Sequence, residues 1–230
     1  MKPRQLTPSG TLRFTSRTRF YHTVPKRDGP FPLVIGLHGY GGRAESILQA
    51  LSAAGRDWVI AAPNAPSPFL PGFPKGETGY SWLTAEERET WLPVALEIVL
   101  ALREKAIADW PVDPDQVYVV GMSQGGALAL ECGISYPELF QGSAALSAFL
   151  MQNPDRIPLP PWSGSGRFLV TIGEEDQTVL PAQTMKGVEY LIEQGYPVTV
   201  RRFRKGHILK LEEIRVLGDW IAGKIAEGAP

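Results

Sequence analysis

The alternation of short apolar runs with longer amphipathic segments constrains the fold of this chain more than any other feature. Five runs are almost continuously apolar, which is typical of parallel strands that are buried on both faces of a sheet. A sixth run, PVTVRRF, alternates instead. The six runs span residues 32–37, 58–62, 117–121, 143–149, 168–173 and 197–203. We therefore predict that most of the chain is organised around a parallel sheet.

Helical segments are predicted between these strands, at residues 43–54, 85–108, 125–136, 181–194 and 210–226. The second helix has the clearest start, because Thr84 and Glu87 are spaced as a capping box. Residues 11–24 alternate and are rich in β-branched and aromatic side chains, which favours a hairpin or strands near a sheet edge. This order of strands and helices predicts an α/β fold, with a mostly parallel central sheet and helices on both faces.

Length and composition exclude several classes of protein. The chain has 230 residues, 43% hydrophobic and 20% charged, which fits a single domain over residues 1–230. A formal net charge of −1, without a basic stripe interleaved with aromatics, predicts that nucleic acid is not a partner. The densest basic stretch, residues 201–205, lies on the alternating run, so we interpret it as exposed cations without a function.

The redox and membrane classes are constrained in the same way. Cys132 is the only cysteine, which excludes an intramolecular disulfide and a zinc site built from thiolates. Residues 1–10 lack the apolar core of a signal peptide, and no stretch approaches the roughly 18 apolar residues that span a bilayer. We therefore expect a cytoplasmic protein without a membrane span.

A single G-x-S-x-G motif, from Gly121 to Gly125, marks Ser123 as a candidate nucleophile. A predicted buried strand precedes the motif and a predicted helix follows it, which is the context of a nucleophile elbow. Such a turn strains the serine backbone and brings neighbouring chain close, so both glycine positions require small residues. The serine would also lie at a helix N-terminus, where the helix dipole favours developing negative charge.

A serine nucleophile needs a base, and the chain offers three histidines, His22, His38 and His207. Behind an elbow of this kind the acid and then the histidine follow the serine along the chain, which selects His207. His207 lies just after the last predicted strand. We interpret His22, in an alternating segment, as structural, and His38 as a residue that orders its own loop.

The acid should lie between Ser123 and His207, and Asp176 is the predicted residue because it directly follows a buried strand. Its carboxylate would hold the histidine in the required tautomer and stabilise the imidazolium. Glu174 and Glu175 are rivals for this role, and Asp155 is a further candidate.

The glycine cluster HGYGGR, which follows the first buried strand, allows two chemistries. It could cradle a dinucleotide pyrophosphate, or it could aim backbone N–H groups at an oxyanion. The dinucleotide fingerprint requires an acidic residue at the end of the next strand, where the chain has Pro63 and Asn64, and Asp57 lies at the wrong end. We therefore predict an oxyanion hole formed by the backbone N–H groups of Tyr40 and Gln124.

Four motifs together resemble the phospholipase/carboxylesterase family of α/β-hydrolases, which includes acyl-protein thioesterases. They are LHGYGG, GMSQGGA, the G-x-x-D of residues 173–176 and the GH of residues 206–207. Trp82 in GYSWL resembles the tryptophan that such enzymes carry before their long helix. The resemblance covers roughly residues 20–225 and implies hydrolysis of carboxylic esters or thioesters without a cofactor. Two positions depart from it: DQTVLP replaces the usual DPVVP after the acid, and Ile208 stands where a smaller residue is expected.

The predicted substrate is a small-molecule ester with a short to medium acyl chain, because no large insertion could serve as a lid. Hydrophobic side chains near the site could line an acyl groove, or they could be core beneath the loops. These candidates are Phe69, Phe73, Trp82, Phe149, Leu150, Met151 and Ile208. Most of them lie in or beside two proline-rich stretches, residues 63–74 and 153–166, which we expect either to wall the pocket or to form rigid surface loops.

Several alternatives stay open at this level. A thioesterase, a lysophospholipase or a peptidase could use the same triad, because fold and triad do not determine the scissile bond. A non-catalytic binding protein of the same fold is disfavoured because every triad position has a suitable occupant. A dehydrogenase is disfavoured by the missing ribose-binding acid. No metal is expected, and a homodimer is left open.

Overall fold

The computed structural model describes residues 17–69, 78–83, 88–151 and 159–225. Its central sheet has seven strands in the order β1-β3-β2-β6-β7-β8-β9. They are β1 (Phe20–Thr23), β2 (Phe31–Leu37), β3 (Val59–Pro63), β6 (Val112–Met122), β7 (Gly142–Leu146), β8 (Arg167–Gly173) and β9 (Val198–Phe203). Every pair in this sheet is parallel except β1 with β3, so the predicted, mostly parallel sheet is confirmed.

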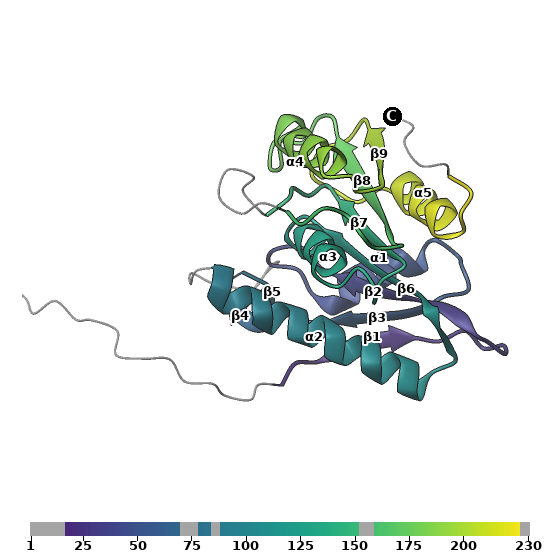
Figure 1. Cartoon of the computed structure of the whole chain (residues 1–230). Helices are drawn as coiled ribbons and strands as arrows, with labels where there is room; N and C mark the ends of the chain where they lie inside the picture. The colour runs from purple at the N-terminus through teal and green to yellow at the C-terminus, as the bar shows by residue number, and fades with distance from the viewer. Residues whose placement is uncertain (1–16, 70–77, 84–87, 152–158, 226–230) are drawn as a thin grey trace, which may run out of the picture.

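Helices cover both faces of the sheet, as predicted (Figure 1). They are α1 (Ala44–Ser52), α2 (Arg88–Asp109), α3 (Gln124–Ser135), α4 (Pro181–Glu193) and α5 (Leu211–Ile221). α1 and α5 pack on one face, where Val34 of β2 joins their apolar side chains. α2, α3 and α4 pack on the other face.

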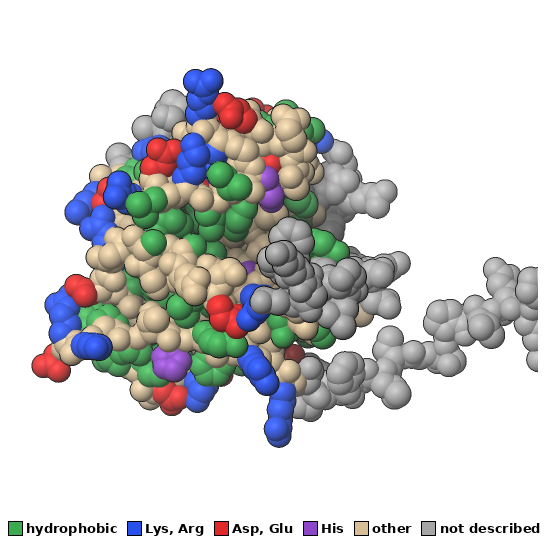
Figure 2. Space-filling model, turned by 180° about the vertical axis from the view of Figure 1, so that it is seen from behind, with side chains coloured by type: hydrophobic (Ala, Val, Ile, Leu, Met, Phe, Trp, Pro, Cys, Tyr) green, Lys and Arg blue, Asp and Glu red, His purple; other side chains and the backbone are tan. Residues whose placement is uncertain are grey.

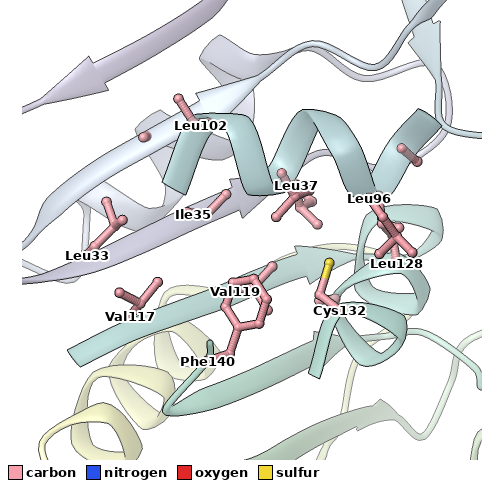
Figure 3. Close-up of a cluster of buried hydrophobic side chains, with 14 of the residues drawn as sticks. Leu33, Ile35, Leu37, Leu96, Leu102, Val117, Val119, Leu128, Cys132 and Phe140 are labelled. Atoms are coloured by element: carbon pink, nitrogen blue, oxygen red, sulfur yellow. The ribbon is translucent and has the colours of Figure 1, made fainter. Parts of the chain in front are cut away.

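The core beneath α2 and α3 follows from the period-2 pattern of the strands. Figure 3 shows Leu33, Ile35 and Leu37 of β2 projecting toward these two helices, next to Val117 and Val119 of β6. All five of these side chains are fully buried. Because both faces of the central strands are covered, their sequences are apolar at every position rather than at alternate ones.

Two features at the periphery were incompletely predicted. The segment 11–24 contributes β1, which lies antiparallel at the sheet edge next to β3; its first residues lie outside the described part of the chain. A separate two-stranded antiparallel sheet, β4 (Ser67–Phe69) with β5 (Gly79–Ser81), was not predicted. The capping box proposed at Thr84 and Glu87 also falls outside the described residues.

The surface carries both signs of charge. Figure 2 shows acidic and basic side chains spread over one face, with hydrophobic side chains between them. None of the helices in the described ranges is long and apolar enough to cross a membrane.

Candidate active site

Ser123 lies at the point where β6 ends and α3 begins, in a sharp turn of the predicted kind. Its backbone has φ 54° and ψ −121°, a conformation that non-glycine residues rarely adopt and that costs free energy to maintain. Its N–H donates to the carbonyl of Leu146 at the end of β7, with an N–O distance of 2.9 Å. The strained turn is therefore fixed to the neighbouring strand.

The two glycines of the motif are required by close backbone contacts. A Cβ atom on Gly121 would lie 2.1 Å from the carbonyl oxygen of Gly125, and a Cβ atom on Gly125 would lie 2.3 Å from that of Leu37. Both contacts are with backbone, which cannot move aside as a side chain can. The sequence requirement for small residues thus follows from how tightly the elbow is folded onto β2.

Asp176 and His207 follow β8 and β9, which are parallel neighbours, so the two side chains meet at the same edge of the sheet. The Nδ1 atom of His207 lies 2.7 Å from Oδ2 of Asp176. An ionised carboxylate can only accept hydrogen bonds, so Nδ1 carries a proton, and in the neutral imidazole the lone pair is then on Nε2. The histidine side chain is 21% exposed and the carboxylate 1%. This is the tautomer that a general base requires.

The second oxygen of Asp176 is also satisfied. Its Oδ1 atom accepts from the N–H groups of Thr178 and Val179, at 2.8 and 2.9 Å. Burial by itself would raise the pKa of this carboxyl, but the hydrogen bonds from Val179, His207 and Thr178 outweigh it and lower the pKa. Asp176 is therefore held ionised.

The rival acids have other surroundings. Glu174 and Glu175 are exposed, and the carboxylate of Glu175 pairs with Arg204 at 3.0 Å. Asp155 lies outside the described residues. Of Glu174, Glu175 and Asp176, it is Asp176 that the fold brings to His207.

Both ring nitrogens of His38 are hydrogen-bonded to backbone groups, one in its own loop and one just after β3. Nδ1 donates to the carbonyl of Gly39 at 2.8 Å, and Nε2 accepts from the N–H of Ala65 at 3.0 Å. Burial lowers its pKa to about 4, so the ring is neutral at physiological pH. With no lone pair left for substrate chemistry, His38 orders the loop. His22, in contrast, is exposed on β1 and stacks on Trp110, with ring centroids 4.3 Å apart.

The glycine loop after β2 lies against the elbow. A Cβ atom on Gly39 would be 3.4 Å from Cβ of Ser123. Two backbone hydrogen bonds hold the loop against Tyr80. The N–H of Gly41 donates to the carbonyl of Tyr80 at 3.0 Å, and the N–H of Tyr80 donates to the carbonyl of Gly42 at 3.2 Å. Tyr40 directly precedes these two glycines, and its side chain is 69% exposed.

The side chain of Gln124 makes contacts that the sequence does not reveal. Its Oε1 atom accepts from the backbone N–H of Trp82 at 2.8 Å, and its Nε2 atom donates to the hydroxyl of Ser81 at 3.0 Å. The indole N–H of Trp82 donates in turn to the carbonyl of His38 at 2.9 Å. The elbow, the glycine loop and the end of β5 therefore form one hydrogen-bonded unit.

The end of β3 is not arranged for a dinucleotide. Oδ1 of the buried Asn64 accepts from the N–H of Ala44, the first residue of α1, at 2.8 Å. A pyrophosphate would need free N–H groups at this helix N-terminus. Asn64 thus takes one of the donors that the dinucleotide interpretation requires.

The hydrophobic candidates for an acyl groove have mixed positions. Trp82 is fully buried and Leu150 is buried, so the core alternative fits these two. Phe149 and Met151 are half-buried, and Ile208, directly after His207, is 56% exposed. The side chains of Phe69 and Phe73 lie outside the described part of the structure.

A polar pocket of about 390 Å³ adjoins the glycine loop. It is lined by Arg19, Tyr21, Arg43, Glu45, Asn64, Thr78 and Tyr80. Because its walls are polar and charged, it differs from the apolar groove that the sequence suggested.

One prediction about the basic stretch is wrong. Lys205 was expected to be an exposed cation, but only 2% of its surface is accessible, and its ammonium group pairs with Glu213. Lys205 lies two residues beyond the end of β9, and its ammonium group reaches the buried carboxylate of Glu213 in α5.

Comparisons with known proteins agree with this architecture. The profile of the family described as "Phospholipase/Carboxylesterase" matches residues 20–223. The carboxylesterase SOBER1 of Arabidopsis thaliana is 27% identical over 133 residues, which cover 57% of this chain and 58% of the relative. A probable carboxylesterase of Oryza sativa subsp. japonica is 26% identical over 217 residues, covering 87% of this chain and 91% of the relative. Several other curated relatives are matched over about half of their length.

Solved structures give the same result at the level of the fold. The crystal structure of SOBER1 superposes with a TM-score of 0.70 at 23% identity, covering 84% of this chain and 98% of that one. Acyl-protein thioesterase 2 of Zea mays superposes with a TM-score of 0.66 at 19% identity, covering 90% of this chain and 99% of that one. The predicted α/β-hydrolase fold is confirmed, and the profile match over residues 20–223 shows that this chain belongs to the phospholipase/carboxylesterase family.

Proposed function

We propose that this protein is a serine hydrolase that cleaves carboxylic esters through an acyl-enzyme intermediate. The observation that carries the proposal is the hydrogen bond between His207 and the ionised Asp176, which leaves Nε2 of the histidine able to accept a proton. The pair follows β8 and β9, at the sheet edge where the strained Ser123 follows β6. Membership of the family supports the same reaction.

In the proposed mechanism, Nε2 of His207 takes the hydroxyl proton of Ser123 while Oγ attacks the ester carbonyl. The backbone N–H groups of Tyr40 and Gln124 bind the negative charge that develops on the carbonyl oxygen. The imidazolium then protonates the leaving alcohol, and Asp176 stabilises its positive charge. Water attacks the acyl-enzyme in a second cycle of the same steps, which returns the serine and releases the acid.

We propose a short to medium acyl chain for the substrate. The apolar side chains of Phe149, Met151 and Ile208 lie near the ends of β7 and β9 and retain exposed surface, which suits a small acyl group. A thioester is the second candidate, because the same nucleophile and oxyanion hole serve it. The similarity in fold to acyl-protein thioesterase 2 of maize supports including it.

Initial rates on p-nitrophenyl esters from acetate to palmitate test the proposal, with the matching acyl thioesters assayed in parallel. Wild type is compared with Ser123→Ala and with Ser135→Ala, an exposed serine at the far end of the same helix. We expect Ser123→Ala to lower kcat by a factor on the order of 10⁴ to 10⁶, and Ser135→Ala to leave it unchanged. Near-normal turnover by Ser123→Ala would refute the nucleophile.

A further inference from the structure

The ammonium group of Lys205 is fully buried two residues before His207, and all of its hydrogen bonds are made inside the protein. Nζ donates to Ser147 Oγ at 2.7 Å, to the carbonyl of Ile208 at 2.8 Å and to Glu213 Oε2 at 2.7 Å. Both charged side chains are 0% exposed. An ammonium has three protons, so each is matched by one acceptor.

These three acceptors connect His207 to the rest of the sheet edge. Lys205 and Ile208 flank the histidine along the chain, so Nζ closes a short loop around it. Glu213 lies in the first turn of α5, and its other oxygen, Oε1, accepts from the hydroxyl of Thr171 in β8. The loop is thereby fixed to one helix and to the strand that precedes Asp176.

The third acceptor leads to the nucleophile. Ser147 has a left-handed backbone, with φ 49°, and follows Leu146, whose carbonyl accepts the N–H of Ser123. The N–H of Ser147 donates to Thr171, to the carbonyl at 3.1 Å and to Oγ1 at 3.2 Å. One short segment at the end of β7 thus contacts both the elbow and the buried ammonium. A strained serine at this place is an arrangement that the surrounding contacts must maintain.

A buried ion pair is a poor means of stabilisation, because desolvating two charges costs about as much as their attraction returns. A well-packed apolar pair would serve the core equally well. The charged pair differs from an apolar pair because its hydrogen bonds are directional, and each proton of the ammonium fixes a different segment of the chain.

We propose that Lys205 is a positioning residue for the reaction, which clamps the His207 loop against Ser147 and Glu213 and so sets the base relative to Ser123. This inference rests on the proposed function of Ser123 and His207. Lys205 itself does not touch the substrate. Its expected effect is on kcat rather than on KM, because it governs the geometry of proton transfer and not the binding of the acyl group.

Two variants separate positioning from simple stability: Lys205→Met, and a double variant that combines Lys205→Met with Glu213→Gln. Lys205→Met leaves a buried, unpaired carboxylate and should lower the urea midpoint strongly. The double variant removes both charges and should recover most of that midpoint. For turnover we expect a different pattern, with kcat reduced about ten- to a hundredfold in both Lys205→Met and the double variant, at a KM within about threefold of wild type.

Leu217→Ala is the matched control, because Leu217 is fully buried in α5 one turn after Glu213 and is not one of the three acceptors of the ammonium. It should lower the urea midpoint by a cavity effect and leave kcat within about threefold of wild type. The proposed positioning role of Lys205 is refuted if the double variant recovers kcat together with the urea midpoint. It is equally overturned by a loss of kcat in Leu217→Ala as large as that in Lys205→Met.

Proton NMR of the Nδ1–H of His207 provides a readout without substrate, assigned by its absence from His207→Gln. We expect the downfield resonance of this short hydrogen bond in wild type and in Leu217→Ala, and its loss or broadening in the double variant. If wild type shows no turnover that depends on Ser123, the proposed function fails and this resonance alone decides the clamp. A resonance unchanged in the double variant overturns it.

Discussion

Acid should destabilise this protein over a pH range that His38 determines. Burial lowers the pKa of the folded side chain from its ordinary value of 6.5 to about 4. Between these two values the unfolded chain binds a proton that the folded chain excludes. The contribution of His38 to the free energy of unfolding is therefore fully present above pH 6.5 and is lost as the pH drops toward 4.

The size of the effect follows from the same two pKa values. Each pKa unit corresponds to about 1.36 kcal/mol, so the whole range is worth about 3.4 kcal/mol. By pH 4.5 most of it is lost, about 2.5 kcal/mol relative to pH 7.5. That is a large part of the free energy of unfolding of an ordinary domain.

The assay is urea unfolding between pH 7.5 and 4.5 for wild type, His38→Gln and His22→Gln. A glutamine at position 38 can accept from the N–H of Ala65 but does not titrate, so His38→Gln should lose about 2.5 kcal/mol less than wild type over this range. The contribution of Asp176 is common to both proteins and cancels in the difference. His22→Gln is the control, because it replaces a histidine that is exposed on β1 rather than buried.

Parallel curves for wild type and His38→Gln would refute the reasoning. They would mean that the ring is protonated in the folded state, and that the hydrogen bond from Ala65 to Nε2 is not maintained in solution. A change in His22→Gln as large as that in His38→Gln would contradict it too, because the effect could then not be assigned to burial.

Two further predictions concern the elbow and the acid. Gly121→Ala should destabilise the fold by more than about 3 kcal/mol in urea unfolding, because its Cβ would lie 2.1 Å from the backbone oxygen of Gly125, and full stability in this variant would contradict the described turn. Asp176→Asn should lower kcat by about 10⁴-fold on p-nitrophenyl acetate, the loss known for this change in serine proteases, because an amide N–H facing Nδ1 selects the wrong histidine tautomer. An effect below tenfold, in a protein that unfolds like wild type, would show that another group orients His207.

The features predicted from sequence are those encoded by local patterns. The buried strands were found because both faces are covered, which makes runs such as PLVIGL apolar at every position. The sharp turn at Ser123 was predicted because its motif stands between a predicted strand and a predicted helix. The hydrogen bond of His207 to Asp176 agrees with an assignment made from chain order and strand ends.

The features that were missed depend on contacts between distant segments. Lys205 was misjudged because its burial depends on Ser147, 58 residues earlier, and on Glu213, 8 residues later. β4 and β5 are three residues long each, too short for a periodic pattern to be distinguished from a loop. The role of the Gln124 side chain depends in the same way on Trp82, 42 residues before it.

The two hydrogen bonds of the Gln124 side chain limit how the region between β3 and α2 can be replaced by the corresponding segment of a relative. Its side chain accepts from Trp82 and donates to Ser81, while its backbone begins the helix that follows Ser123. A segment transplanted from a relative, to alter which acids are released, would have to present an N–H and a hydroxyl at the same two places. Grafts that end before Ser81 keep this junction intact, whereas longer ones replace part of the support of the elbow together with the segment.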